Sequence, residues 1–309
     1  MTLWIVFAAV VLGMLALDLG VFHRRAHAIQ FREALGWSVA WFTLAVVFAG
    51  VVYHWRGPEQ AFAFFAGYLI EWSLSADNVF VFLVIFSYFR VPAEYQHRVL
   101  FWGIVGAVIM RAILVTIGVV LINKVHAIVY LFGAFLIITG IRMALAGDVE
   151  IHPEKNPVLK LVRRILPVTR RYYGGRFLLR RMGRTFATPL LVVLTVVEST
   201  DVVFAVDSVP AVLAISRDPF IVYTSNVFAI LGLRALYFVL AGFMKMFHYL
   251  KYGLSLILVF VGFKMVVSDL LEIPTTMALG VVAVILLVSV AVSLFAPPGI
   301  RRHGPGEPT

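Results

Sequence analysis

Long apolar runs dominate the sequence, each about as long as a membrane is thick. No charged side chain occurs between Lys124 and Arg142, or between Glu272 and Arg301. A helix needs about 20 predominantly apolar residues to cross the hydrocarbon core, and within lipid it satisfies its own backbone groups. With 62% hydrophobic and 14% charged residues, the chain is predicted to be an all-α polytopic membrane protein. The nine predicted spans are 2–22, 34–54, 60–89, 99–122, 126–146, 188–215, 221–244, 250–271 and 275–296.

The first run is predicted to be a retained span and not a cleaved signal peptide. No basic residue precedes it, it contains Asp18, and Arg24 and Arg25 follow it. Asp18 lies close to the end of this span, where it either pairs with Arg24 or Arg25 or belongs to a cation pathway.

The basic residues predict how the spans are oriented. Most of them fall on one side of the nine alternating spans, whereas Arg56, Lys124 and Arg217 fall on the other. Because cytoplasmic loops carry the excess of lysine and arginine, we expect the N-terminus outside and the C-terminus in the cytoplasm. Four basic residues fall inside spans: Arg111, Arg142, Arg234 and Lys264.

Composition also limits the chemistry. The chain has no cysteine, so thiolate metal sites, disulfides and cysteine catalysis are excluded. The net charge of +10 is explained by topology, and no nucleic-acid partner is expected. No zincin motif, nucleophile pattern or cofactor fingerprint occurs, so we predict neither an enzyme nor a bound cofactor.

The third predicted span carries acids at membrane depth, in the sequence Glu71-Trp-Ser-Leu-Ser-Ala-Asp77-Asn78. An intramembrane carboxylate costs roughly 2.5–3.5 kcal/mol on insertion scales and is a functional-site hypothesis by default. Helical spacing places Glu71 and Asn78 on one face and Ser73 and Asp77 on a neighbouring face. Unwinding between Ser73 and Asp77 would add backbone carbonyls, as in the broken helices of transporters.

The sixth predicted span holds three carboxylates within ten residues. Glu198, Asp201 and Ser208 fall on one helical stripe. Asp207 reaches that stripe only if the helix is irregular, and Pro210 is a nearby helix breaker.

The two acidic spans belong to a predicted repeat. Asp77-Asn78-Val79 matches Asp207-Ser208-Val209, and Glu71 and Asp201 each stand six residues before the aspartate. The next spans match at Arg111 and Arg234, and those after them at His126/His248, Tyr130/Tyr252, Leu136/Leu258, Gly140/Gly262, Arg142/Lys264 and Met143/Met265. Under the predicted topology the two three-helix units are inverted, as in many secondary transporters. The predicted divisions are 1–59 (two helices), 60–146 (unit 1), 147–187 (a basic cytoplasmic loop), 188–272 (unit 2) and 273–309 (the last helix and a tail).

The acidic groups predict a cation site at the interface between the units. The predicted metal ligands are Glu71, Asp77, Asn78, Glu198, Asp201, Asp207 and Ser208, and the predicted pathway or charge partners are Asp18, Ser73, Arg111 and Arg234. Oxygen ligands suit hard cations such as calcium, magnesium and manganese. Arg111 either pairs with an acid of the site or hydrogen-bonds to backbone. The surplus of carboxylates motivates a hypothesis of proton coupling.

These motifs, together with Leu17-Asp18-Leu19, resemble the TerC family, including its Alx-type proteins, over roughly residues 1–296. The resemblance implies a manganese exporter of the bacterial cytoplasmic membrane. The family's site residues carry over to Asp77, Asn78, Glu198, Asp201 and Asp207, and less directly to Glu71, Ser73 and Ser208.

Two alternatives stay open. The protein could be a non-transporting assembly or tellurite-resistance factor that acts through protein partners. The basic loop either contains an amphipathic helix on anionic lipid or only determines topology.

Overall fold

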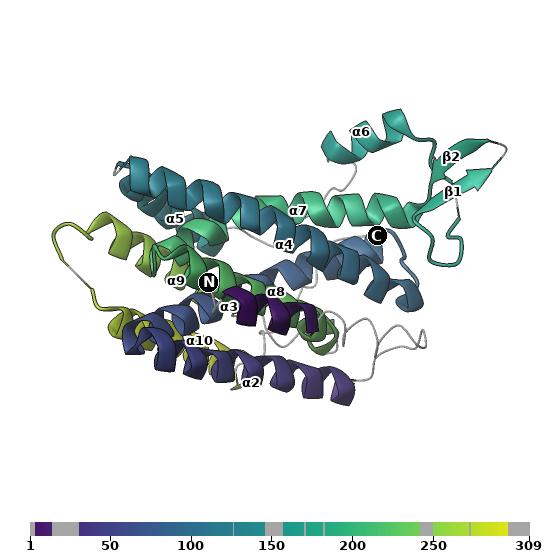
Figure 1. Cartoon of the computed structure of the whole chain (residues 1–309). Coiled ribbons are helices and arrows are strands. Elements are labelled where there is room, and N and C mark those ends of the chain that lie inside the picture. Colours follow the sequence, from purple (N-terminus) through teal and green to yellow (C-terminus); the bar gives the residue numbers. More distant parts are fainter. Residues whose placement is uncertain are drawn as a thin grey trace, which may run out of the picture.

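The computed structural model describes residues 4–13, 31–125, 127–145, 157–169, 171–181, 183–241, 250–271 and 273–295. Long helices lying alongside one another form most of it (Figure 1), so the prediction of a helical chain is confirmed. The helices are Trp4–Gly13, α2 (Phe31–Arg56), α3 (Pro58–Tyr88), α4 (Ala93–Lys124), α5 (Ala127–Leu145), α6 (Pro157–Ile165), α7 (Pro189–Leu213), α8 (Pro219–Ala241), α9 (Leu250–Val266) and α10 (Thr275–Phe295), and the strands are β1 (Leu178–Arg181) and β2 (Arg184–Ala187). Among these residues, α2, α4, α5, α7 and α10 are long and apolar enough to cross a membrane by length and composition.

The two acid-bearing helices run without a break. α3 starts at Pro58 after Gly57, whose φ of 91° suits glycine, and α7 starts at Pro189. Proline is favourable in the first helical turn because its missing N–H has no partner there in any case. Pro210 lies inside α7 without ending it. The unwound segment considered for residues 73–77 is absent from α3, and α9 ends at Val266 instead of 271 because turns follow it.

The helices of the two predicted units contact each other in reciprocal pairs: α3 with α8, α4 with α7, and α5 with α9. Gly67 of α3 lies against Ser225 of α8, and further along both helices Phe86 meets Tyr237 edge-to-face. α3 and α8 therefore run parallel. α4 and α7 are also parallel, with Gly103 against Val197 and Gly118 against Leu213.

α5 and α9 are antiparallel and cross at glycines. A Cβ on Gly140 would lie 2.8 Å from the Ser255 carbonyl oxygen, and one on Gly262 would lie 2.6 Å from the Gly133 carbonyl oxygen. In the predicted alignment, Gly140 corresponds to Gly262 and Gly133 to Ser255. The crossing thus contacts itself symmetrically, as expected for two related units in opposite orientation.

The basic segment before α7 contains α6 and an antiparallel hairpin of β1 and β2, in which Leu178 pairs with Ala187. The hairpin was not predicted. Its turn uses Gly183 at a φ of 74°. The Tyr172 hydroxyl donates to the Phe89 carbonyl oxygen at 2.8 Å, which ties this segment to the turn between α3 and α4. In Figure 1 the hairpin projects at the end of the bundle where α7 begins.

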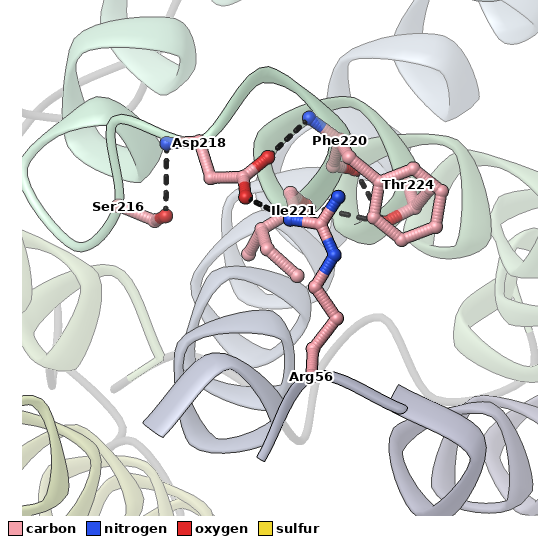
Figure 2. Close-up of polar contacts among 6 residues, drawn as sticks. All are labelled: Arg56, Ser216, Asp218, Phe220, Ile221 and Thr224. Atoms are coloured by element: carbon pink, nitrogen blue, oxygen red, sulfur yellow. Dashed lines mark hydrogen bonds and ion pairs between the residues drawn. The ribbon is translucent and has the colours of Figure 1, made fainter. Parts of the chain in front are cut away.

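A different contact closes the turn between α7 and α8 (Figure 2). Arg56, at the end of α2, forms an ion pair with Asp218, and its guanidinium lies 5.4 Å from the centre of the Phe220 ring. The other carboxylate oxygen of Asp218 accepts a hydrogen bond from the Phe220 N–H at 2.8 Å, and Asp218 N–H donates to Ser216 Oγ at 3.2 Å. Asp218 therefore caps the start of α8 and anchors α2 to it.

Candidate functional site: a buried ion cluster and an acidic pocket

Arg111 contacts helices of both predicted units. Its side chain, from the middle of α4, is almost fully buried and forms an ion pair with Glu71 of α3. On its other side, Arg111 Nη2 lies 3.6 Å from Asp201 Oδ1, and Nη1 donates to Ser208 Oγ at 3.0 Å. Asn226 Nδ2 of α8 donates to the second Glu71 oxygen at 3.0 Å. We call Glu71, Arg111, Asp201, Ser208 and Asn226 the Arg111 cluster.

The cluster joins equivalent acids of the two units through one guanidinium. Asp201 and Ser208 are seven residues apart, so both lie on the same face of α7. Glu71 and Asp201 correspond in the predicted repeat. Of the two alternatives for Arg111, the structure therefore shows the ion pair with acids of the site.

The cluster leaves space for about one water molecule. Asp201 Oδ2 is buried and has no hydrogen-bond partner. Beside Asp201 lies a cavity of about 10 Å³, lined also by Gly103, Ala107 and Val197. A cavity of roughly 10–15 Å³ can hold one water, which needs polar partners. The Arg111 cluster is therefore a closed site, in which the guanidinium already occupies the position of a cation.

Glu198 lies one turn before Asp201 and is only partly buried. Its carboxylate lies against Gly106 of α4, where a Cβ would be 2.0 Å from Glu198 Oε1. No residue other than glycine leaves room for the carboxylate in this position. Glu198 thus approaches α4 one to two turns from Arg111 on the same helix.

Asp207 faces a second, open pocket of about 390 Å³. Asn78 of α3 and Arg142 of α5 line it too, and Thr139 Oγ1 lies at hydrogen-bond distance, 3.5 Å, from Asp207 Oδ1. We call this the Asn78–Asp207 pocket; its remaining lining is Leu74, Phe135, Met143, Phe204 and Leu258. Helices of both units thus contribute to it.

The predicted site is therefore divided in two. Glu71, Asp201, Ser208 and Arg111 converge in the Arg111 cluster, while Asn78 and Asp207 share the pocket. Asp207 misses the other acids because α7 is regular: one residue before Ser208, it points about 100° away. In the described part of the chain, no three acids or histidines converge as a ready metal-binding group.

Other predicted residues are placed differently. Ser73 donates its hydroxyl to the Leu69 carbonyl oxygen at 2.5 Å, so it bonds to its own helix. Asp18 lies outside the described residues, and so do the side chains of Asp77 and Arg234, whose backbones are helical.

Four polar or close-packed contributors were not predicted as site residues: Asn226, Thr139, Gly106 and Arg142, the last of which was noted only as a basic residue inside a span. Asn226 follows Thr224 and Ser225 in the first half of α8, which contains no charged residue. A run of three polar residues at membrane depth was the available signal for Asn226, since such groups need partners. No comparable signal marks Thr139 or Gly106, whose roles depend on which helices lie opposite them.

A sequence model described as "Integral membrane protein TerC family" matches residues 56–299. The chain belongs to the TerC family. The multi-pass membrane prediction is thereby confirmed, together with the resemblance. A Myxococcus xanthus relative, "Uncharacterized membrane protein STKORF319", is 51% identical to this TerC protein. The match covers 98% of this chain and 94% of the relative.

Two further relatives show how widely this TerC sequence is shared. The Escherichia coli K12 protein named "Putative membrane-bound redox modulator Alx" is 48% identical over 93% of this chain and 92% of its own. A Rickettsia felis protein, "Uncharacterized membrane protein", is 40% identical over 94% of this chain and 97% of its own. No solved structure matches this TerC protein.

Proposed function

We propose that this TerC protein exports divalent cations, with Mn²⁺ as substrate, across the bacterial cytoplasmic membrane. The observation that carries the proposal is the Asn78–Asp207 pocket, an open space that helices of both units line and that offers oxygen ligands. In transporters built from inverted repeats, substrate sites lie at the interface between the repeats.

The chemistry of this pocket favours a hard cation. Among the polar residues of the described lining, Asp207, Asn78 and Thr139 offer oxygen ligands, Arg142 is the one cation, and no histidine is present. Carboxylate and carbonyl oxygens suit Mn²⁺, Mg²⁺ and Ca²⁺, whereas copper and zinc favour imidazole or thiolate. Asp77 is a further ligand predicted from the sequence, and because its side chain lies outside the described residues its role is left to the experiment below.

Arg111 supports the proposal by compensating buried charge. Glu71 and Asp201 could not both remain ionised at this depth without a nearby cation. With the guanidinium between them, the two carboxylates stay ionised and fixed in position, and the substrate occupies the separate Asn78–Asp207 pocket. Protons bound by the surplus carboxylates in the empty state would make the export proton-coupled.

Cellular manganese tests the proposal directly. Cells that lack the protein should accumulate Mn²⁺, measured by elemental analysis, and wild-type protein should restore efflux. Asp77→Asn and Asp207→Asn should each fail to restore it, because an amide removes the negative charge. Asp218→Asn is the matched control, since it makes the same change outside the site. Rescue by Asp77→Asn and Asp207→Asn would overturn the proposal and favour an assembly factor acting through protein partners.

Vesicles test coupling separately. Purified protein in vesicles should carry Mn²⁺ faster when a pH gradient is imposed. Transport that is indifferent to the gradient would remove proton coupling but leave cation export in place. The Alx relatives are named redox modulators, but this chain contains no cysteine. We therefore do not propose thiol exchange for it.

A further inference from the structure

The short helix α6 presents three different surfaces. Leu159 is 1% exposed and packs in the core that contains Leu190 and Val193 of α7. Lys160, Arg163 and Arg164 are exposed. The apolar residues Val158, Leu161 and Ile165 are also exposed, by 42%, 55% and 67%.

These three surfaces are arranged in a particular order around the helix. At about 100° per residue, Val158, Leu161 and Ile165 fall on one side. Lys160, Arg163 and Arg164 fall on the opposite side. Leu159, which faces the bundle, lies on a third side between the apolar and the basic residues. A helix resting on the flank of a bundle at a membrane interface needs this order: protein on one side, acyl chains on the next, and headgroups and water opposite the acyl chains.

The surroundings of α6 are strongly basic. Arg180, Arg181 and Arg184 of the hairpin are exposed, as are Arg171 and Arg176 before it. The sequence contains no aspartate or glutamate between Glu154 and Glu198, so no acid of this segment offsets the charge. The segment lies where α7 begins and where the α3–α4 turn is anchored through Tyr172, which places it at a bundle end.

We propose that α6 and the β1–β2 hairpin form a binding surface for anionic phospholipid, with Val158, Leu161 and Ile165 among the acyl chains and the basic side chains on the headgroups. Charge complementarity selects this partner, because each lysine or arginine near an anionic surface strengthens binding by about fivefold. A segment that only determined topology would need the charges but not the exposed apolar side chains of Val158, Leu161 and Ile165, which we call the apolar ridge. This proposal is independent of the transported ion.

The absence of native cysteine permits a direct test. Single cysteines in full-length protein, Leu161→Cys and Ile165→Cys on the apolar ridge and Lys160→Cys on the basic side, would carry a spin label in vesicles of 70% phosphatidylcholine and 30% phosphatidylglycerol. Labels at 161 and 165 should collide mainly with lipid-soluble oxygen, and the label at 160 mainly with a water-soluble nickel chelate. Equal access of the nickel chelate to all three positions would overturn the proposal, and a water-soluble protein partner would then be the better candidate.

Lipid selectivity is measured with a fluorophore at Leu161→Cys and quenching by brominated lipids. Brominated phosphatidylglycerol should quench several-fold better than brominated phosphatidylcholine. The variant Lys160→Gln/Arg163→Gln/Arg164→Gln should bring that ratio close to one, while Arg56→Gln/Lys124→Gln/Arg217→Gln, with the same loss of charge elsewhere, should leave it unchanged. The spin-label variants Leu161→Cys and Ile165→Cys keep every basic residue, so they test the proposal even if the triple variant misfolds. A ratio near one in the wild-type background would contradict it.

Discussion

At the scale of single residues, the balance of charge around Arg111 decides what the buried site tolerates. Two acids and one guanidinium lie almost fully out of solvent. Removing one partner of a buried pair leaves an uncompensated charge and typically costs 3–5 kcal/mol, although the intact pair itself can contribute little net stability. Arg111 faces two acids, whereas Glu71 faces one guanidinium, so the consequences of their loss are unequal.

We therefore predict that Arg111→Leu lowers the free energy of unfolding by about 3–5 kcal/mol and that Glu71→Leu lowers it less, because Asp201 still compensates Arg111. The double variant Glu71→Leu/Arg111→Leu should cost less than the sum, as expected for groups in one network. Unfolding of the purified protein in detergent, followed by circular dichroism, gives all three values. Additive losses would show that Glu71 and Arg111 do not interact.

Gly106→Ala tests the position of Glu198. The new Cβ would overlap the Glu198 carboxylate, which is the free end of a flexible side chain and can move. We expect a small loss of stability but a several-fold loss of Mn²⁺ transport, measured as initial rates in vesicles. Gly280→Ala, at a helical position with no neighbour within 4 Å, is the control. Unchanged transport by Gly106→Ala would show that the position of the Glu198 carboxylate does not affect transport.

At the scale of helices, close backbone approach sets how the units fit together. In the α5–α9 crossing, the atoms nearest to Gly140 and Gly262 are backbone atoms together with one side-chain carbon each, from Val259 and Ile137. Small residues allow such approach in membrane bundles, where packing replaces the hydrophobic driving force.

Gly140→Ala and Gly262→Ala should therefore each destabilise the protein by about 1–3 kcal/mol, the usual effect of overpacking. Because the two positions are equivalent in the repeat, the two losses should be similar. Melting temperatures in one detergent, with Gly280→Ala as reference, provide the comparison. A large loss in one variant and none in the other would argue against a symmetric crossing.

The Asp218 cap separates two weaker contributions (Figure 2). Arg56 and Asp218 have side chains 35% and 24% exposed, so their ion pair should be worth only about 0.2–1 kcal/mol. Asp218→Asn keeps an oxygen for the Phe220 N–H and should lose no more than that. Asp218→Ala also removes the cap and should lose about 1 kcal/mol more. Equal losses in urea unfolding would mean that the cap contributes nothing.

The sequence predicted the helices far better than it predicted which side chains meet. Residues 60–89 were expected as a span and α3 covers Pro58–Tyr88, because composition and length suffice to define a membrane helix. The separation of Asp207 from Asp201 depends on the rotation of α7 against its neighbours, which periodicity leaves open. Asn226 was missed because the first half of α8 contains no charged residue that would have marked this helix as part of the site. The hairpin was missed because its arginine-rich strands show no alternating apolar pattern.

At the scale of the whole molecule, the reciprocal contacts describe two units in opposite orientation. Parallel pairing of α3 with α8 and of α4 with α7, together with antiparallel α5 and α9, is the pattern that an inverted repeat produces. The two bundle ends then differ in charge. One carries α6, the hairpin and the α3–α4 turn, rich in arginine, whereas the α7–α8 turn carries the Arg56–Asp218 pair.

This difference predicts the orientation in the membrane. Because arginine-rich ends stay in the cytoplasm, Arg184→Cys in the hairpin should be cytoplasmic and Arg217→Cys, in the α7–α8 turn, should be outside. Both side chains are exposed, and the cysteine-free chain gives no background labelling. In spheroplasts, a membrane-impermeant maleimide should label the cysteine at 217 at once and the one at 184 only after permeabilisation. The reverse order would invert the molecule, so that α6 and the hairpin would face outwards and could not contact the anionic lipids of the cytoplasmic leaflet.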